Sequence, residues 1–262
     1  MNLPSPTPAG QEAKEMGFLE HLGELRTRLI TCAIAITLLA CVSYSFSEWL
    51  FNLLTRPYFN AFAHDTLIGT GPAEAFMLRI KVSFFSGLLL SLPVLFYQLW
   101  MFVAPGLYHE ERRLVLPFVV ISSLLFAAGA SFCYKIIFPF AFDFFKEQYQ
   151  AIGLTPAIRM TEHLSVMVQG MLGFGLVFEM PVAAYFLGRA GIINHRMMIS
   201  GLRYAIVIIF IAAGVLTPPD VLTQFLMALP LLALYGISIL IVKYCGSAVA
   251  SEPPTSPDQP NL

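Results

Sequence analysis

The chain has 262 residues, of which 57% are hydrophobic and only 12% are charged, and its mean hydropathy is +0.74. This composition is too apolar for a soluble domain of this length and predicts an all-α, polytopic membrane protein. The net charge of −1, with no basic stripe along the chain, argues against nucleic-acid binding.

Six apolar segments are predicted to form transmembrane helices. In chain order they cover about Leu29–Phe46, Val82–Val103, Leu114–Phe132, Leu164–Leu187, Tyr204–Leu216 and Val221–Val242. The fifth segment has only 13 residues. As a helix it would extend about 20 Å, against a hydrocarbon core of about 30 Å. We therefore expect local thinning of the bilayer, or snorkelling of flanking side chains, beside this helix.

The remaining sequence divides the chain into three regions. We predict a disordered N-terminal segment over residues 1–16, a six-helix membrane domain over residues 17–245 and a disordered, proline-rich tail over residues 246–262. Two long connecting segments, residues 48–79 and 134–162, are expected to cap the far side of the membrane and to include short interfacial helices.

The distribution of lysine and arginine favours a cytoplasmic location for both termini. With this orientation, nine of these residues lie in inner segments and six in outer segments. The inner loops are short and their charges lie close to helix ends, where the positive-inside rule applies best.

The first candidate site is the polar stretch HLGELRTR before the first span. Glu24 and Arg28 are four residues apart, so they can form an ion pair on one helix face. The simplest interpretation is an interfacial helix whose charges stay among lipid headgroups and orient the span. Alternatively, Glu24 contributes to a site that binds a cation.

The second candidate site is the segment WMFVAPGLYHEERR at the end of the second span. Its simplest interpretation is an aromatic belt followed by a basic cytoplasmic loop. Such a loop has no need of two adjacent acids, however, and here Glu110 and Glu111 precede the two arginines. These acids are expected on the same side of the membrane as Glu24, so the three carboxylates together could hold a cationic peptide. This requires that they are not locked in internal ion pairs.

Glu179 is the only acid well inside an apolar segment. An ionised carboxylate costs several kcal/mol in hydrocarbon, so this side chain should face protein or water. It could be neutral, or hydrogen-bonded to Gln169, a threonine or backbone on a neighbouring helix, in a glycine-rich interface that lets helices pack closely. It could instead be functional, for example as the carrier carboxylate of a proton-coupled secondary transporter. Such transporters often show inverted repeats, and we find none here.

The sequence offers no candidate catalytic or metal centre. Its five histidines are scattered over loops without ligand spacing, and no nucleotide-binding, hydrolase or metalloprotease motif occurs in a suitable context. We therefore predict a protein that is not an enzyme and that carries no cofactor or metal.

Four stretches, taken together, resemble the TatC family, the signal-recognition component of the twin-arginine protein translocase. They are HLGELRTRL, PAEAFMLRIKVSFFSGLLLSLPVLFYQLWMFVAPGLYHEERR, FGLVFEMPV and LTPPD, and the resemblance extends from about Gly17 to Lys243. It implies a concave six-helix bundle with short last two helices. It also implies a receptor that binds the twin-arginine signal peptides of folded proteins on the cytoplasmic face of the inner membrane.

The resemblance further implies partners and an energy source. The receptor would form homo-oligomers within the complex, contact membrane lipid and nucleate assembly with single-span TatA and TatB proteins. Export would be driven by the proton-motive force.

The same resemblance implies roles for individual residues. Signal-peptide recognition falls on Glu24, Arg26 and Glu111, and Phe102 borders this site. Glu110 occupies a position where the family often has a non-acidic residue, and it could share the contact.

Three further matches lie away from this site. The acid of the fourth span falls on Glu179, which with Gln169 would line a polar pocket that contacts a partner helix. Asp220 and Pro57 match an acid and a proline on the far side.

Glutamates are chemically suited to recognise paired arginines. An arginine can bind a carboxylate through two parallel hydrogen bonds, which lysine cannot reproduce. Two charge-assisted contacts could favour arginine over lysine by roughly 10² to 10⁴.

Overall fold

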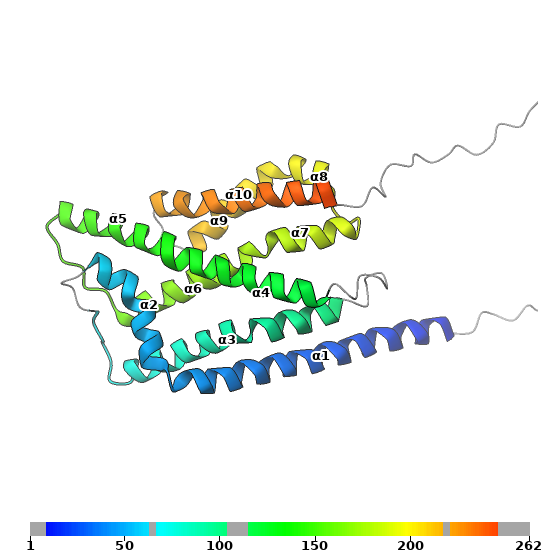
Figure 1. Ribbon diagram of the computed structural model, residues 1–262, viewed down its shortest axis with the longest axis horizontal. Helices are drawn as coiled ribbons and strands as arrows, with labels where there is room; N and C mark the ends of the chain where they lie inside the picture. Colours follow the sequence, from blue (N-terminus) through cyan, green and yellow to red (C-terminus); the bar gives the residue numbers. More distant parts are fainter. Residues whose placement is uncertain (1–8, 63–66, 104–114, 217–220, 246–262) are drawn as a thin grey trace, which may run out of the picture. The chain divides into compact units, whose positions relative to one another are not determined.

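The computed structural model describes residues 9–62, 67–103, 115–216 and 221–245 (Figure 1). Over these residues the protein is almost entirely helical, and the β pairing is limited to a single bridge between Ile68 and Arg159. The prediction of an all-α fold is therefore confirmed.

Five stretches of the described chain are long and apolar enough to cross a membrane. They are His21–Tyr44, Glu74–Phe102, Val115–Ala151, Met160–Arg189 and Thr223–Tyr244. A shorter apolar stretch, Leu202–Val215, lies between the last two. These six stretches match the six predicted spans in order, and they identify a multi-pass membrane protein.

The chain divides into two compact units, which are described separately. The first comprises residues up to 53 and residues 71–123, and it is built on helices α1 (Ala9–Tyr44) and α3 (Glu74–Val103). These helices lie side by side in opposite directions (Figure 1). Their backbones approach closely at Gly87, where an added Cβ would lie 2.4 Å from the backbone nitrogen of Ala40. A small residue at this crossing lets the two helices pack tightly.

Helix α1 begins before the predicted end of the N-terminal disordered segment. We expected disorder up to residue 16, but α1 begins at Ala9. Residues 11–15 are strong helix formers and no proline lies between Pro8 and the end of α1, so the helix of the first span can extend toward the N-terminus. The remaining residues predicted to be disordered, 1–8 and 246–262, lie outside the described residues.

Polar contacts join the start of α2 (Ser47–Ala61) to α3. The Nε of Arg79 donates a hydrogen bond to the Oγ of the fully buried Ser47 at 3.1 Å. The same guanidinium lies 3.9 Å from the Glu48 carboxylate. Because α2 follows directly after α1, these contacts help to fix the ends of α1 and α3 that lie away from Glu24.

The second unit comprises residues 54–70 and 124–262. Its helices are the end of α2, the end of α4 (Val115–Phe132), the π-helical turn η3 (Cys133–Ile137), α5 (Phe138–Ala151), α6 (Met160–Phe178), α7 (Met180–Arg189), α8 (His195–Ser200), α9 (Leu202–Leu216) and α10 (Val221–Cys245). The presence of α2 and α5 confirms that the long connecting segments contain helices.

The last two helices differ in length. As predicted, α9 is short, with 15 residues. In contrast, α10 has 25 residues and extends about 37 Å, so the expectation that both helices are short is wrong for α10. Pro230 lies inside α10 without ending it, as transmembrane helices often tolerate. The side chain of Gln224 on α10 donates a hydrogen bond to the carbonyl of Phe210 on α9 at 2.8 Å.

Candidate functional site

Glu24 on α1 is paired with Arg28, one helical turn later. The Nε of Arg28 donates a hydrogen bond to Glu24 Oε1 at 3.0 Å, and its Nη2 donates to the same oxygen. The third nitrogen, Nη1, donates to the side-chain oxygen of Gln98 on α3 at 3.2 Å. The predicted ion pair is therefore confirmed, and Arg28 also connects the two helices.

The second carboxylate oxygen of Glu24 faces a pair of aromatic rings. Oε2 lies 3.7 Å from Nδ1 of His21, and the His21 ring stacks on Phe102 of α3, with centroids 4.4 Å apart and planes inclined by 14°. Gln98 and Phe102 are one turn apart on α3, so each meets a polar partner on α1. The structure thus brings together Glu24 and Phe102, two residues that the sequence predicted for one site.

Glu24 is engaged in an ion pair with Arg28, whereas the peptide-binding hypothesis from the sequence required a carboxylate that is not held in an internal ion pair. Its side chain is nevertheless 35% exposed, whereas that of Arg28 is 18% exposed. An ion pair that is partly open to water contributes only modestly to stability, so a competing cation can replace one partner. The exposed Arg26 lies on the same helix and has no ion-pair partner among the described residues.

Glu179 lies at a break in the fourth predicted span, which we expected to be continuous. Helix α6 ends at Phe178 and α7 begins at Met180, with Glu179 between them. Pro181 causes this break because it has no N–H group and its ring clashes with the carbonyl four residues earlier. The N–H of Glu179 instead donates to the carbonyl of Leu176 at 3.1 Å. The Glu179 side chain is half-buried.

The structure does not support a direct hydrogen bond between Gln169 and Glu179, and their shared role in a polar pocket stays a prediction. Gln169 is exposed on α6 and lies ten residues before Glu179, which corresponds to about 15 Å along the helix. That separation is too long for a hydrogen bond between the two side chains. Around the break, the helices instead pack through glycines: a Cβ on Gly175 would lie 2.4 Å from the ring of Phe126.

Three predicted site residues, Glu110, Glu111 and Asp220, lie outside the described residues. Pro57 is buried inside α2, beside the fully buried Tyr58.

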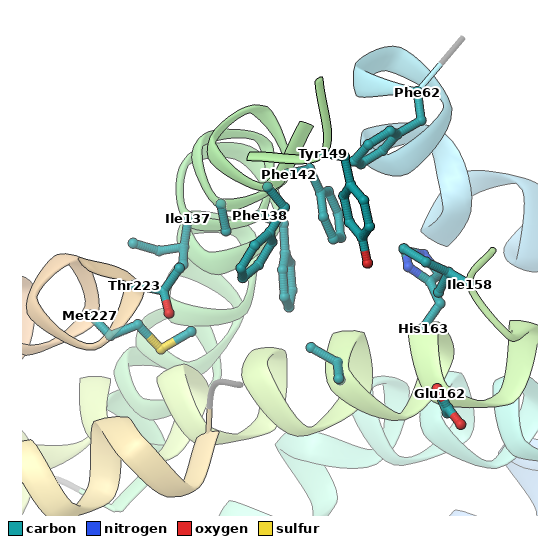
Figure 2. Close-up of a pocket in the computed structure, with 13 residues that line it drawn as sticks. Phe62, Ile137, Phe138, Phe142, Tyr149, Ile158, Glu162, His163, Thr223 and Met227 are labelled. Carbon is teal, nitrogen blue, oxygen red and sulfur yellow. The ribbon is translucent and has the colours of Figure 1, made fainter. Parts of the chain in front are cut away.

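The second unit contains a cavity of about 300 Å³ that the sequence analysis missed (Figure 2). The rings of Phe138, Phe142 and Tyr149 line it along α5, with His163 at one end and Met227 at the other. These three α5 residues and Phe145 follow one another at intervals of four, three and four, so a helical periodicity search would have found this face. The predicted site residues that the structure describes do not line this cavity.

Two residues of the α1–α3 site were also missed. The sequence pattern assigns no role to His21, because the histidines lack the spacing of metal ligands, and it assigns none to Gln98. Gln98 could have been identified from the sequence, because it is a single amide inside the apolar run LPVLFYQLW. A polar side chain in such a run needs a hydrogen-bond partner.

Comparison with known proteins identifies the family of this chain. The family model described as "Sec-independent protein translocase protein (TatC)" matches residues 20–230. The chain belongs to the TatC family. Among curated TatC proteins, it is 42% identical over 243 residues to that of Desulforapulum autotrophicum, which covers 92% of this chain and 90% of the relative. It is 40% identical over 230 residues to that of Helicobacter pylori strain 26695, which covers 87% and 88%.

A solved TatC structure has the same fold. The "Crystal Structure of Twin Arginine Translocase Receptor- TatC" superposes with a TM-score of 0.78 at 37% identity and covers 86% of this chain and 99% of that one. The resemblance seen in the sequence is therefore confirmed. The chain is a component of the Sec-independent protein translocase, a transport role that implies partnership with other Tat subunits. The alternative of a proton-coupled solute transporter is not favoured.

Proposed function

We propose that this TatC-family protein is the receptor for twin-arginine signal peptides on the cytoplasmic side of the inner membrane. The observation that carries the proposal is the cluster at the adjoining ends of α1 and α3. There, the partly exposed Glu24 carboxylate lies against the His21–Phe102 stack. The stack offers an apolar surface beside an anionic group, which suits a peptide with arginines next to apolar residues.

The other proposed contacts come from the same end of α3. Phe102 lies one residue before the end of this helix, and Glu110 and Glu111 follow within the next nine residues. Because no more than nine positions of the chain separate these acids from Phe102, we assign them to the same site as Glu24. We propose that Glu24 and Glu111 each bind one arginine of the peptide, with Glu110 as a secondary acceptor and Arg26 at the edge of the site.

The proposal extends to assembly. We place both termini in the cytoplasm, because the distribution of lysine and arginine favours that orientation. Several copies would act in one complex within the lipid bilayer. TatA and TatB are the partners, and the proton-motive force drives export. Glu179, at the break between α6 and α7, is the proposed contact for a partner helix, because a half-buried carboxylate at a helix break can accept a hydrogen bond from a neighbouring polar group. Catalysis has no part in this function.

Binding of a synthetic twin-arginine peptide to the full-length protein in lipid nanodiscs tests the proposal. We expect Glu24→Gln to weaken binding by about tenfold, because it removes the charge from one hydrogen-bonded contact. Glu48→Gln is a suitable control, since it neutralises an exposed acid just beyond the other end of α1. Equal affinities for the unmodified protein and Glu24→Gln would contradict the proposed role of Glu24.

A further inference from the structure

Arg28 occupies the carboxylate of Glu24, which a visiting arginine would also need. Its three guanidinium nitrogens all donate hydrogen bonds, two of them to Glu24 Oε1 and one to Gln98. Arg28 is also the more buried member of the ion pair. An arriving guanidinium therefore meets a carboxylate with one oxygen already engaged, whereas a bidentate contact needs both oxygens.

Gln98 contributes to this arrangement without adding charge. It accepts from Nη1 at 3.2 Å, which leaves Nε and Nη2 directed at Glu24. Since Gln98 lies on α3, the contact fixes the Arg28 side chain from a second helix. The cost in side-chain entropy of holding a long arginine in one geometry is thereby reduced.

We propose that Arg28 is an internal competitor of the signal-peptide arginine, held on Glu24 by Gln98, so that the peptide binds by exchange. This rests on the proposed function, in which Glu24 is a peptide contact. On binding, the peptide guanidinium takes over Glu24, while Arg28 keeps its contact with Gln98. The affinity of the receptor is then set by the difference between two arginine–carboxylate contacts, which favours release of the peptide after delivery.

Competition makes a distinctive prediction about affinity. Removing the competitor should tighten binding of every cationic peptide that uses Glu24, and by the same factor, so that the preference for twin arginine over twin lysine stays the same. If Arg28 merely supported Glu24, its removal would weaken binding instead.

The test is peptide titration by fluorescence anisotropy, with full-length variants in nanodiscs. We expect Arg28→Gln to tighten binding of both the twin-arginine and the twin-lysine peptide by about fivefold, and Gln98→Leu by about twofold. Gln98→Leu removes no charge, so a gain there cannot come from a change in net charge. Thr37→Val is the matched control, because Thr37 makes only a local hydrogen bond to Ala33 further along α1, and it should leave affinity unchanged.

A double-mutant cycle separates the proposed role of Arg28 as a competitor from the proposed role of Glu24 as a peptide contact. In a Glu24→Gln background, Arg28→Gln should no longer tighten binding. A gain that persists there would reflect overall charge and would overturn the inference, as would unchanged or weaker binding by Arg28→Gln alone. If Glu24→Gln by itself leaves twin-arginine binding unaffected, the proposed function fails at this residue, independently of Arg28.

Discussion

Replacement of Gly87 by alanine tests the packing that positions the candidate site. An alanine Cβ would lie 2.4 Å from the nitrogen and 2.6 Å from the Cα of Ala40, about 1 Å inside ordinary contact. Because both obstructing atoms belong to the backbone of α1, no side chain can rotate away, and the helices must separate. Overpacking of this kind costs about 1–3 kcal/mol. We expect the midpoint of thermal unfolding to fall by about 3–10 °C.

The measurement is a thermal unfolding curve of purified protein in one detergent, recorded from near-ultraviolet circular dichroism. Gly236→Ala is the matched control, since a Cβ at Gly236 on α10 would have no atom within 4 Å. It should leave the midpoint unchanged or raise it slightly, because alanine favours helix. If Gly87→Ala unfolds at the same temperature as the unmodified protein, the close crossing of α1 and α3 described above is incorrect.

Two further predictions concern acids outside the α1–α3 contact. In an export assay, Glu179→Gln should retain more activity than Glu179→Leu, because a polar group at the break between α6 and α7 can still hydrogen-bond a partner; equal export by the two variants would argue against a polar contact there. In the peptide titration, Glu111→Gln should weaken twin-arginine binding by about tenfold and Glu110→Gln by clearly less, since we assign the arginine contact to Glu111. A larger effect of Glu110→Gln would reverse that assignment.

Much of the helical architecture could be predicted from the sequence because apolar segments of about 20 residues carry a strong signal. The break at Glu179 could have been predicted as well, since Pro181 two residues later disrupts the helix. The extension of α1 back to Ala9 was missed because polar helix formers show no apolar periodicity. The length of α10 differs from the short helix that the family resemblance implied, although its apolar run is long enough for a full span.

The site was harder to predict than the fold. The spacing of Glu24 and Arg28 is visible in the sequence, and the structure confirms their pair. The contacts of Arg28 with Gln98 and of His21 with Phe102 depend on the register between α1 and α3, because each joins residues that are 70 or more positions apart in the chain. That register is set by the close crossing at Gly87, which a single sequence does not reveal. Glu24 itself is engaged by Arg28 on the same helix, so its pairing does not depend on that register.

The most direct test of the receptor account compares two peptides on the unmodified full-length protein. One carries the paired arginines of a signal peptide and the other carries lysines at the same two positions, with identical flanking sequence. We expect the twin-arginine peptide to bind at least about tenfold more tightly, since only arginine forms bidentate contacts with the glutamates. Equal affinity for the two peptides would contradict the account.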